Sequence, residues 1–565
     1  MENVVLEILE WLGSLAIFLY GMKMMSEALL KIAGSRMKSI LAVIRSNRIV
    51  GMLMGVVVTM IVQSSSATIV MLVSAVNAGI ITLGESIGMI MGANIGTTIT
   101  GWIIAFFGFN VDVWFLVLPM IGVAMPFVFS KVNKRHSWGE AILGFSLIFM
   151  GIHFLRITMP YATSLPSLAE FVNDYCQLGT LSIIIFLAIG TAITILVQSS
   201  SATMAFTIVL CMHKWIPFEI GAAMILGENI GTTVTANIAA QVGNISAKRA
   251  AFVHFLFNAT GAVIAVILFK PFLHLVDTLT VAMLDTSPYD DGYAVPIALA
   301  TLHTSFNLIN TVIFISFTSM IERIVMHFKR GKKNEEEEFH LKYISTGLMS
   351  TSELSLIQAK KEISFFAKHT QKMFSFVREL EFDSDMSESK FGKLYSKIES
   401  YEKISDDVEY EIANYLTKVN QARMSDSGRR RSKSMIKIVG ELESIGDCNF
   451  TMARLINKMH EQKIRVTKKM SDKIAFMFNM VDEALNTMLE NLDKLDFSAD
   501  VVKAQEIETQ INRYRDQVKA ENFDNIKLEQ YSYEQSVFFM DLIQECENLG
   551  NRIVNVSEIL DEAVD

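Results

Sequence analysis

The sequence predicts an all-α protein in two parts: a polytopic membrane unit with inverted repeats and two re-entrant hairpins, then a cytoplasmic helical-bundle domain. Of the 565 residues, 51% are apolar, which is too many for a wholly soluble chain and enough for two or three domains. The long apolar segments end near Phe328, and the sequence beyond is charged and helical in its periodicity. Two polar strings also recur inside the apolar part at one fixed spacing, which indicates an internal repeat.

Charge and cysteine usage exclude several classes of protein. The net charge is −9, and no basic patch with interleaved aromatic residues is present, so nucleic acid is not an expected partner. The four cysteines are far apart and lack metal-like spacing, so we expect no disulfide framework. The first ten residues are acidic where a cleaved signal peptide would be basic, which favours a retained membrane helix at the start.

Seven segments have the length of membrane-crossing helices, because about 20 residues span the ~30 Å of hydrocarbon. They are residues 9–30, 84–109, 113–130, 138–159, 218–241, 250–275 and 294–320. Residues 51–80 and 179–215 differ, since a polar string divides each into apolar halves of roughly a dozen residues, or about 18 to 21 Å of helix. Neither half is expected to cross alone, so both segments predict re-entrant hairpins surrounded by protein.

The polar string at each predicted hairpin tip is QSSSAT, at residues 63–68 and 198–203. Each copy is followed by Gly-x-Asn-Ile-Gly-Thr-Thr, at residues 92–98 and 227–233, and the Gln-to-Asn spacing is equal, since 94 − 63 = 229 − 198 = 31. Scattered small residues such as Gly88 and Ser146 are best explained by close helix packing. Matched strings at one spacing favour a binding site instead, because unpaired polar groups cost several kcal/mol each in apolar surroundings.

The predicted topology inverts the second hairpin relative to the first, because three crossings separate them. One hairpin then opens to each side of the membrane and the tips meet near the midplane, the arrangement of an alternating-access transporter. The positive charges that fall on one predicted side, which we assign to the cytoplasm, are Lys31, Arg36, Lys38, Arg45, Arg48, Lys131, Lys134, Arg135, Lys248, Arg249, Arg323, Lys329 and Arg330. The opposite side carries Glu170, Asp174, Asp277, Asp285, Asp290 and Asp291, with Arg156, Lys214 and Lys270 as exceptions.

The tips suit an anion with co-bound cations. Helix N-terminal N–H groups and hydroxyls bind anions, whereas freed carbonyls and Gln and Asn oxygens hold a small hard cation. Neither island contains Lys or Arg, so an anion there requires cations to offset its desolvation. Glu228 replaces Ala93 of the first copy, and we leave open whether it is an ion ligand or is solvated at the rim. For the strings His254–Asn258 and His303–Asn307, we favour interhelical hydrogen bonding over substrate contact.

These motifs resemble the type II sodium-phosphate cotransporter family over about residues 13–320. The resemblance implies coupled sodium and inorganic phosphate transport across the cytoplasmic (inner) membrane by a domain of residues 1–330, with repeat one at about 9–130 and repeat two at about 138–320. By the same resemblance, phosphate is bound by Ser64, Ser65, Ser66, Ser199, Ser200, Ser201, Thr98 and Thr233. The implied sodium ligands are Gln63, Thr68, Asn94, Thr97, Gln198, Thr203, Asn229, Thr232 and Glu228.

The charged part begins with a solvated linker at residues 331–351 and continues as six predicted helices in two sets of three. These are residues 352–381, 387–424, 427–461, 467–495, 499–521 and 528–561. Residues 401–419 and 441–447 are similar to the PhoU family of phosphate regulators, so residues 352–565 are identified as a PhoU-like regulatory domain. This implies a homodimer or signalling partner and a divalent or transition metal at Glu402, Asp406, Glu443 and Asp447. An ordinary solvated acidic stripe is an equal alternative, and in the second set Asn512 and Asn551 replace the aspartates.

Three other functions are compatible with parts of the sequence. A phosphate exporter has the same motifs, because a PhoU-like tail serves relief of excess phosphate as well as import. A membrane-bound phosphate sensor without flux is a second alternative. An intramembrane serine enzyme is disfavoured, because no His or Lys lies beside either serine run, and we expect no enzyme.

Overall fold

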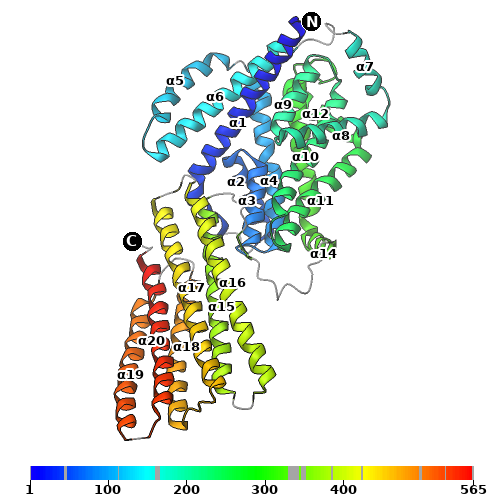
Figure 1. The fold of residues 1–565 in the computed structure, drawn as a ribbon. Coiled ribbons are helices and arrows are strands. Elements are labelled where there is room, and N and C mark those ends of the chain that lie inside the picture. The colour runs from blue at the N-terminus through cyan, green and yellow to red at the C-terminus, as the bar shows by residue number, and fades with distance from the viewer. Residues whose placement is uncertain are drawn as a thin grey trace. The chain divides into compact units, whose positions relative to one another are not determined.

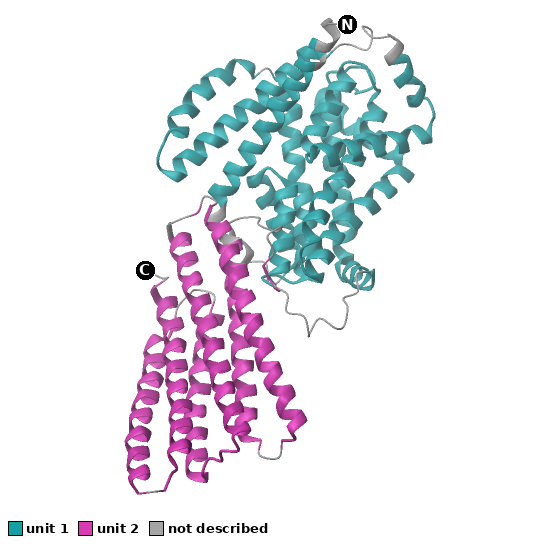
Figure 2. Ribbon diagram, viewed as in Figure 1, with its two compact units in different colours: residues 1–333, 347–354 teal, residues 334–346, 355–565 magenta. Residues whose placement is uncertain are grey.

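The computed structural model describes residues 2–42, 47–111, 113–159, 166–328, 341, 343–344, 352–383, 386–421, 424, 426–494, 499–528 and 530–562. Over these residues the protein is helical and contains no strand (Figure 1). The chain divides into two compact units, residues 1–333 with 347–354 and residues 334–346 with 355–565 (Figure 2). Most of the predicted linker at 331–351 lies outside the described residues.

The first unit contains helices α1 to α14. They are α1 (Glu2–Ala42), α2 (Arg48–Val62), α3 (Ser65–Asn77), α4 (Leu83–Ile103), the π-helix η1 (Ile104–Asn110), α5 (Trp114–Val128), α6 (Asn133–Thr158), α7 (Pro166–Cys176), α8 (Thr180–Val197), α9 (Ser200–Met212), α10 (Phe218–Ala240), α11 (Ile245–Ile267), α12 (Phe269–Leu284), α13 (Val295–Phe314), the 3₁₀ turn η3 (Ile315–Phe317) and α14 (Thr318–Phe328).

Five helical segments of the described chain are long and apolar enough to cross a membrane. They are Leu83–Asn110, Asn133–Thr158, Thr180–Val197, Ile245–Ile267 and Gly292–Phe328. Four of them overlap the predicted spans 84–109, 138–159, 250–275 and 294–320. The predicted span 113–130 corresponds to α5, whose 15 residues include Pro119 and Pro126 and extend only about 22 Å.

The predicted span 250–275 overlaps the segment Ile245–Ile267 but ends too late, because the chain breaks at Leu268 between α11 and α12. Pro271 explains the position of the break. Proline lacks an N–H, and its ring would clash with the carbonyl four residues earlier, which belongs to Ile267, the last residue of α11. In α12, Pro271 is the third residue, where no intrahelical N–H bond is needed.

The two polar islands both fall at breaks between consecutive helices. Three of the four flanking helices are short, since α2 has 15 residues and α3 and α9 have 13 each. Helix α8 has 18 residues, or about 27 Å, and is apolar enough to cross a membrane. The prediction that neither half of residues 179–215 can cross alone is therefore wrong for α8.

Glycines bring the helix before each break against the helix of the following string. A Cβ on Gly55 of α2 would lie 2.2 Å from the Met89 carbonyl oxygen of α4. The equivalent Gly190 of α8 would place a Cβ 2.3 Å from the Met224 oxygen of α10. Only glycine permits this approach, so the two copies share one mode of backbone packing.

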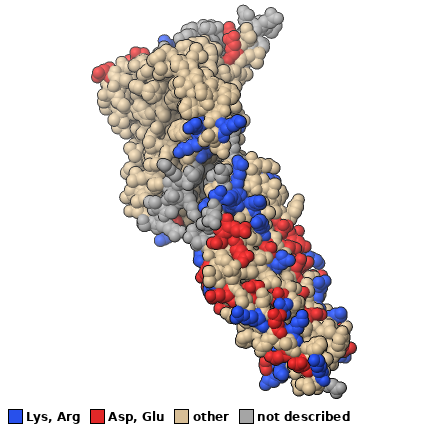
Figure 3. All heavy atoms as spheres, turned by 90° about the vertical axis from the view of Figure 1, so that its left-hand side faces the viewer, with Lys and Arg blue, Asp and Glu red and all other residues tan. Residues whose placement is uncertain are grey.

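The second unit is a six-helix assembly with one continuous apolar core. Its helices are α15 (Ser352–Phe382), α16 (Glu388–Gln421), α17 (Asp426–Glu461), α18 (Lys468–Asp493), α19 (Val501–Lys527) and α20 (Tyr533–Glu562). Four of them agree with the predicted segments to within three residues at each end, and α19 and α20 agree to within six. Core residues such as Phe374, Leu442 and Leu542 belong to one cluster, and the grouping of the helices into two sets of three stays a prediction. On the face drawn in Figure 3, charged residues cover this unit and are sparse on the first.

Candidate functional site

The two islands adopt the same local backbone. Gln63 ends α2 with φ 55° and ψ 27°, and Gln198 ends α8 with φ 57° and ψ 26°. The following serines, Ser64 and Ser199, are extended and accept a hydrogen bond from Ala67 and Ala202, each at 3.2 Å. A left-handed conformation is costly for a residue with a side chain, so its presence at both glutamines indicates a shared structural demand.

Each break presents the N-terminus of a helix together with hydroxyl groups. Ser65, Ser200 and Ser201 are buried, whereas Ser64, Ser66 and Ser199 are half-buried. Thr68 and Thr203 close the islands by donating to the carbonyl oxygens of Ser64 and Ser199, at 2.9 and 3.1 Å. Free N–H groups and a positive helix-dipole end favour an anion at such a terminus.

The two glutamines differ in their surroundings. Thr100 donates to Gln63 Oε1 at 3.0 Å, and the Gln63 amide donates to the Met60 carbonyl oxygen. Gln198 is exposed, and its carboxamide makes no hydrogen bond with any described residue. The breaks are therefore equivalent in backbone but differ in side-chain environment.

A cavity of about 310 Å³ opens beside Gln63 and Thr100. The rest of the wall is formed by apolar side chains of α1, α4, η1, α5 and α6, and these include the ring of Trp138 on α6. Gln63 and Thr100 are the polar groups on its wall, so the cavity joins the first island to an otherwise apolar space.

The glycines of the second string serve helix packing. A Cβ on Gly92 would lie 1.9 Å from the Met52 oxygen, and one on Gly227 would lie 1.9 Å from the Leu187 oxygen. Gly96 and Gly231 meet α2 and α8 nearly as closely. The packing explanation that the sequence supports for scattered glycines therefore applies inside the repeated string as well.

The asparagines of the two strings lie in equivalent three-residue networks. His254 Nε2 and Asn258 Nδ2 of α11 bond to Asn94 Oδ1 at 3.2 and 3.5 Å. His303 Nε2 and Asn307 Nδ2 of α13 bond to Asn229 Oδ1 at 3.2 and 3.3 Å. The expected interhelical hydrogen bonding of the two His-and-Asn strings is confirmed, and the sequence did not indicate that the partners are the motif asparagines.

These networks determine which atoms are available to a ligand. Asn94 Oδ1 accepts two hydrogen bonds, so both of its lone pairs are engaged, while Asn94 Nδ2 donates one of its two hydrogens to the Ile90 oxygen at 3.0 Å. Because Asn94 Oδ1 is an acceptor, His254 Nε2 carries the proton and His254 Nδ1 is an acceptor. That nitrogen and Asn258 Oδ1 are buried and have no hydrogen-bond partner among the described residues, and the same holds in the other network.

The threonines of the strings keep their acceptor lone pairs. Thr97 and Thr232 donate to the carbonyl oxygens four residues earlier, at 3.0 and 2.9 Å. Thr98 and Thr233 donate to the oxygens three residues earlier, at 2.8 and 2.7 Å. Each hydroxyl donates its one hydrogen to a carbonyl oxygen of its own helix. Its oxygen can therefore still accept a hydrogen bond or ligate a cation.

Glu228 is 2% exposed, so the alternative that it is solvated at the rim is wrong. Its carboxyl group lies 2.9 Å from Thr207 Oγ1 of α9. Helix α9 also packs against α4, and α3 packs against α10, so the helix after each break contacts the helix that carries the string of the other copy.

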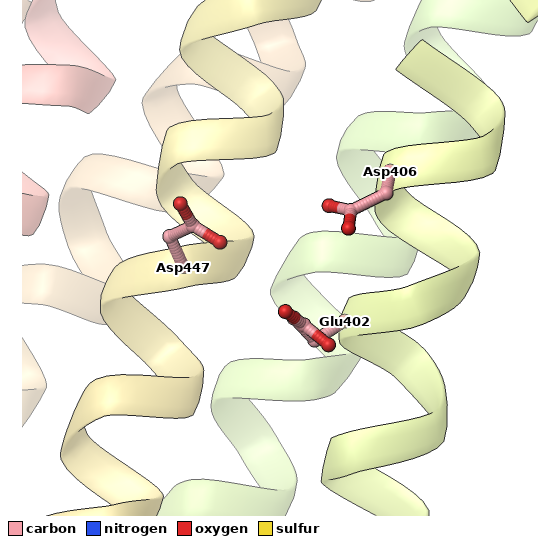
Figure 4. Close-up of side chains that lie close together, drawn as sticks. All are labelled: Glu402, Asp406 and Asp447. Carbon is pink, nitrogen blue, oxygen red and sulfur yellow. The ribbon is translucent and has the colours of Figure 1, made fainter. Parts of the chain in front are cut away.

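In the second unit, Glu402, Asp406 and Asp447 bring carboxylate oxygens within 4.8 Å of one another between α16 and α17 (Figure 4). Burial, and then the neighbouring carboxylates, raise the pKa of Glu402 and of Asp406. Three oxygens at this separation suit a divalent cation. Glu443 is not part of this group, although burial and Asp447 raise the pKa of its carboxyl.

The corresponding residues of the second set of helices form hydrogen bonds with one another. Asn512 donates to Glu508, and Asn551 donates to Glu547 at 3.1 Å. Arg515 lies 4.0 Å from Glu547. The two glutamate carboxylates accept hydrogen bonds from the neighbouring amide groups. Because an amide replaces each aspartate, these described residues form no cluster of metal ligands.

Apolar helices interrupted at two equivalent polar breaks define a multi-pass helical membrane protein. A model of the family described as Na+/Pi-cotransporter matches residues 17–156 and 172–283. The chain is also 30% identical over 312 residues to the uncharacterized protein YqeW of Bacillus subtilis, covering 54% of this chain and 94% of that protein. The chain belongs to the Na+/Pi-cotransporter family.

Two further relatives bear on different parts of the chain. The putative inorganic phosphate export protein YjbB of Salmonella typhimurium is 21% identical over 515 residues, 90% of this chain and 88% of that protein. The sodium-dependent phosphate transport protein 2A of Rattus norvegicus is 38% identical over 98 residues, 17% of this chain and 15% of that protein. No solved structure matches the chain.

Proposed function

We propose that this protein transports inorganic phosphate across the inner (plasma) membrane, coupled to sodium, by alternating access. The observation that carries the proposal is the repeated break: two helix N-termini with the same left-handed glutamine and serine cap, each on a helix that packs against the helix carrying the string of the other copy. Family membership and the names of the relatives support phosphate as the anion. A transporter of this family acts without catalysis.

In this proposal the phosphate is bound between the two breaks. Ser64, Ser65, Ser66 and the equivalent Ser199, Ser200, Ser201 supply hydroxyl donors, and Thr98 and Thr233 complete the site. The N-terminal N–H groups of α3 and α9 add donors without adding charge. With no Lys or Arg in either island, the anion depends on co-bound cations for neutralisation.

Sodium is assigned to the oxygens around each break. Gln63, Thr68, Thr97 and their equivalents Gln198, Thr203, Thr232 have acceptor lone pairs that can face a cation. Asn94 and Asn229 can join only if one of their two accepted hydrogen bonds is released. Binding of sodium at these residues is therefore linked to movement of α11 and α13.

The unequal glutamines support an alternating mechanism. The Gln63 carboxamide accepts a hydrogen bond from Thr100, whereas the Gln198 carboxamide is exposed and makes no hydrogen bond with a described residue. Two equivalent breaks in different environments are what one conformation of an inverted-repeat transporter requires. In the opposite conformation we expect Gln198 to be hydrogen-bonded and Gln63 to be exposed.

The direction of transport has two candidates, import and export. Export is favoured by the full-length similarity to a putative phosphate export protein, since 515 aligned residues must include much of the second unit.

We propose that this cytoplasmic, PhoU-like unit regulates transport, with a divalent cation at Glu402, Asp406 and Asp447 and a homodimeric or signalling contact. Deletion of residues 334–565 should then leave transport intact and alter its response to phosphate supply. Loss of folded transporter would show a structural role instead.

The test is radiolabelled phosphate flux in proteoliposomes, measured in both directions under sodium, lithium and choline gradients. We expect flux that requires sodium, with the faster direction identifying import or export. Phosphate binding without flux under any gradient would favour the membrane-bound sensor. Flux that is equal in choline would refute sodium coupling.

A further inference from the structure

The apolar cavity beside the first break extends along α6 for about half the thickness of a membrane. Its wall includes α6 residues from Trp138 to Phe149, which are 149 − 138 = 11 positions apart and span about 16 Å along the helix axis. The hydrocarbon core of a bilayer is ~30 Å thick, so one leaflet contributes ~15 Å. The cavity therefore has the length of one acyl chain, and its volume of about 310 Å³ suits a single apolar ligand.

The two ends of the cavity differ in exposure. At the inner end Met22, Ile148 and Phe149 are buried, whereas Trp138 at the other end is 45% exposed. A ligand can therefore enter beside Trp138, and tryptophan is enriched where a membrane protein meets the headgroup region. Three methionines in the wall can adapt their shape to a flexible chain.

Basic side chains lie next to Trp138 at the start of α6. Lys134 and Arg135 are four and three positions before Trp138, so both are its neighbours on the helix surface. Lys131, Lys134 and Arg135 are exposed, and none of them makes an ion pair with a described residue. On the face drawn in Figure 3, Lys and Arg of the first unit gather largely in one patch within an apolar surface.

The carboxylate nearest to these basic residues in the sequence, Glu140, already has two partners. Its oxygens lie 3.0 Å from Lys31 Nζ and 3.1 Å from His136 Nε2. Glu140 is therefore engaged elsewhere, and the three exposed basic residues keep their positive charge for another group. The start of α6 at Asn133 adds the positive end of a helix dipole, so an anion is favoured at this end of the cavity.

We propose that one anionic phospholipid binds here, with its phosphate at Lys131, Lys134 and Arg135 and one acyl chain in the cavity against Gln63 and Thr100. The predicted topology places the three basic residues on the cytoplasmic side, where anionic lipids are enriched and basic pockets between membrane helices bind their headgroups. Free inorganic phosphate has the charge but no chain to fill the apolar space. This lipid site is separate from the proposed phosphate site and goes beyond the proposed function.

The bound chain stabilises the first break in the conformation described. Thr100 donates to Gln63 Oε1 at 3.0 Å on the wall of the cavity. Hydrocarbon in the cavity excludes water from this hydrogen bond, and a hydrogen bond is stronger in surroundings of low dielectric constant. The exposed Gln198 does not line this cavity, so the lipid should slow local opening at the first break and leave the second unchanged.

The first test measures which lipid reaches Trp138 in nanodiscs that contain the full chain. Phosphatidylcholine is mixed with increasing amounts of either phosphatidylglycerol or phosphatidylcholine whose acyl chains are brominated near the headgroup end, since bromine quenches tryptophan fluorescence on contact. The Trp138 signal is the difference between the wild type and Trp138→Phe. We expect brominated phosphatidylglycerol to quench this signal at a several-fold lower mole fraction than brominated phosphatidylcholine.

Charge variants test the headgroup contacts by the same measurement. Lys134→Gln combined with Arg135→Gln should abolish the preference for phosphatidylglycerol, because each basic residue near a membrane surface strengthens anionic-lipid binding about fivefold. The matched control combines Lys214→Gln with Lys270→Gln, two exposed residues on the opposite predicted side, and should keep the preference. Equal quenching by the two lipids in the wild type, or a preference that persists without Lys134 and Arg135, would overturn the proposal. Displacement of brominated phosphatidylglycerol by inorganic phosphate would also overturn it.

Hydrogen–deuterium exchange tests the link to the first break. In phosphatidylglycerol nanodiscs, we expect the amides around Gln63 to exchange several-fold more slowly than in phosphatidylcholine, and the amides around Gln198 to exchange equally in both. Ala141→Phe places a ring in the cavity and should remove the difference at Gln63. Equal exchange at Gln63 in both lipids would refute the stabilising effect of the chain. Neither measurement uses phosphate flux, so absence of flux would count against the proposed function alone.

Discussion

Substitution of Gly227 by alanine should disrupt the packing that positions the second island. The added Cβ would lie 1.9 Å from the Leu187 oxygen of α8, whereas real Cβ contacts essentially never fall below 3.0 Å. Helix α8 must therefore retreat by at least 1.1 Å, the difference between these distances, and the atoms in its way are backbone atoms. Overpacking of this kind costs about 1–3 kcal/mol. We expect a lower melting temperature in detergent and a large loss of phosphate flux, because Gln198 ends α8.

Gly122→Ala is the matched control, since a Cβ there meets nothing within 4 Å and alanine favours a helix interior by up to about 1 kcal/mol. We expect this variant to be at least as stable as the wild type and to transport normally. Gly92→Ala should repeat the effect of Gly227→Ala in the first copy, where the distance to the Met52 oxygen is also 1.9 Å. Wild-type melting temperature and flux in Gly227→Ala would refute the close approach of α8 and α10.

Two further variants test the asparagine networks and the acidic cluster. His303→Ala removes one of two donors to Asn229 Oδ1, and we expect a loss of about 1–3 kcal/mol in stability and a weaker sodium dependence of flux, measured by thermal unfolding and uptake; unchanged values would contradict a positioning role. In the second unit, burial and Asp447 raise the pKa of Asp406 in the folded state, so its negative charge destabilises the fold. This loss of stability is absent at low pH, where the carboxyl group is protonated, and it develops as the pH rises through the folded pKa. A divalent cation should therefore raise the melting temperature at pH 7 and less so in acid, and Asp447→Asn should abolish that rise; a rise that persists in Asp447→Asn would exclude the cluster as its source.

Much of the architecture could be predicted because it depends on local patterns. Helical periodicity located all six helices of the second unit, and the polar strings marked both breaks. The break at Leu268 was missed because the prediction of a span at 250–275 relied on the length of the apolar segment and gave too little weight to Pro271. The length of α8 was missed because its apolar run continues beyond the dozen residues expected.

The candidate site was predictable in its residues but not in their contacts. Spacing of four between His254 and Asn258 placed both on one face of a helix, yet only the tertiary structure brings them to Asn94. Likewise, the matched strings favour a binding site in the sequence, but their glycines contact neighbouring helices. The pairing of Glu228 with Thr207 is also non-local, since 21 residues separate them.

The most direct test of the two-break phosphate site is radiolabelled uptake by Ser65→Ala and Ser200→Ala in proteoliposomes with a sodium gradient. These equivalent residues are 5% and 8% exposed and begin α3 and α9. Both variants should insert and purify like the wild type and should lose phosphate flux. Wild-type flux in both variants would contradict the site.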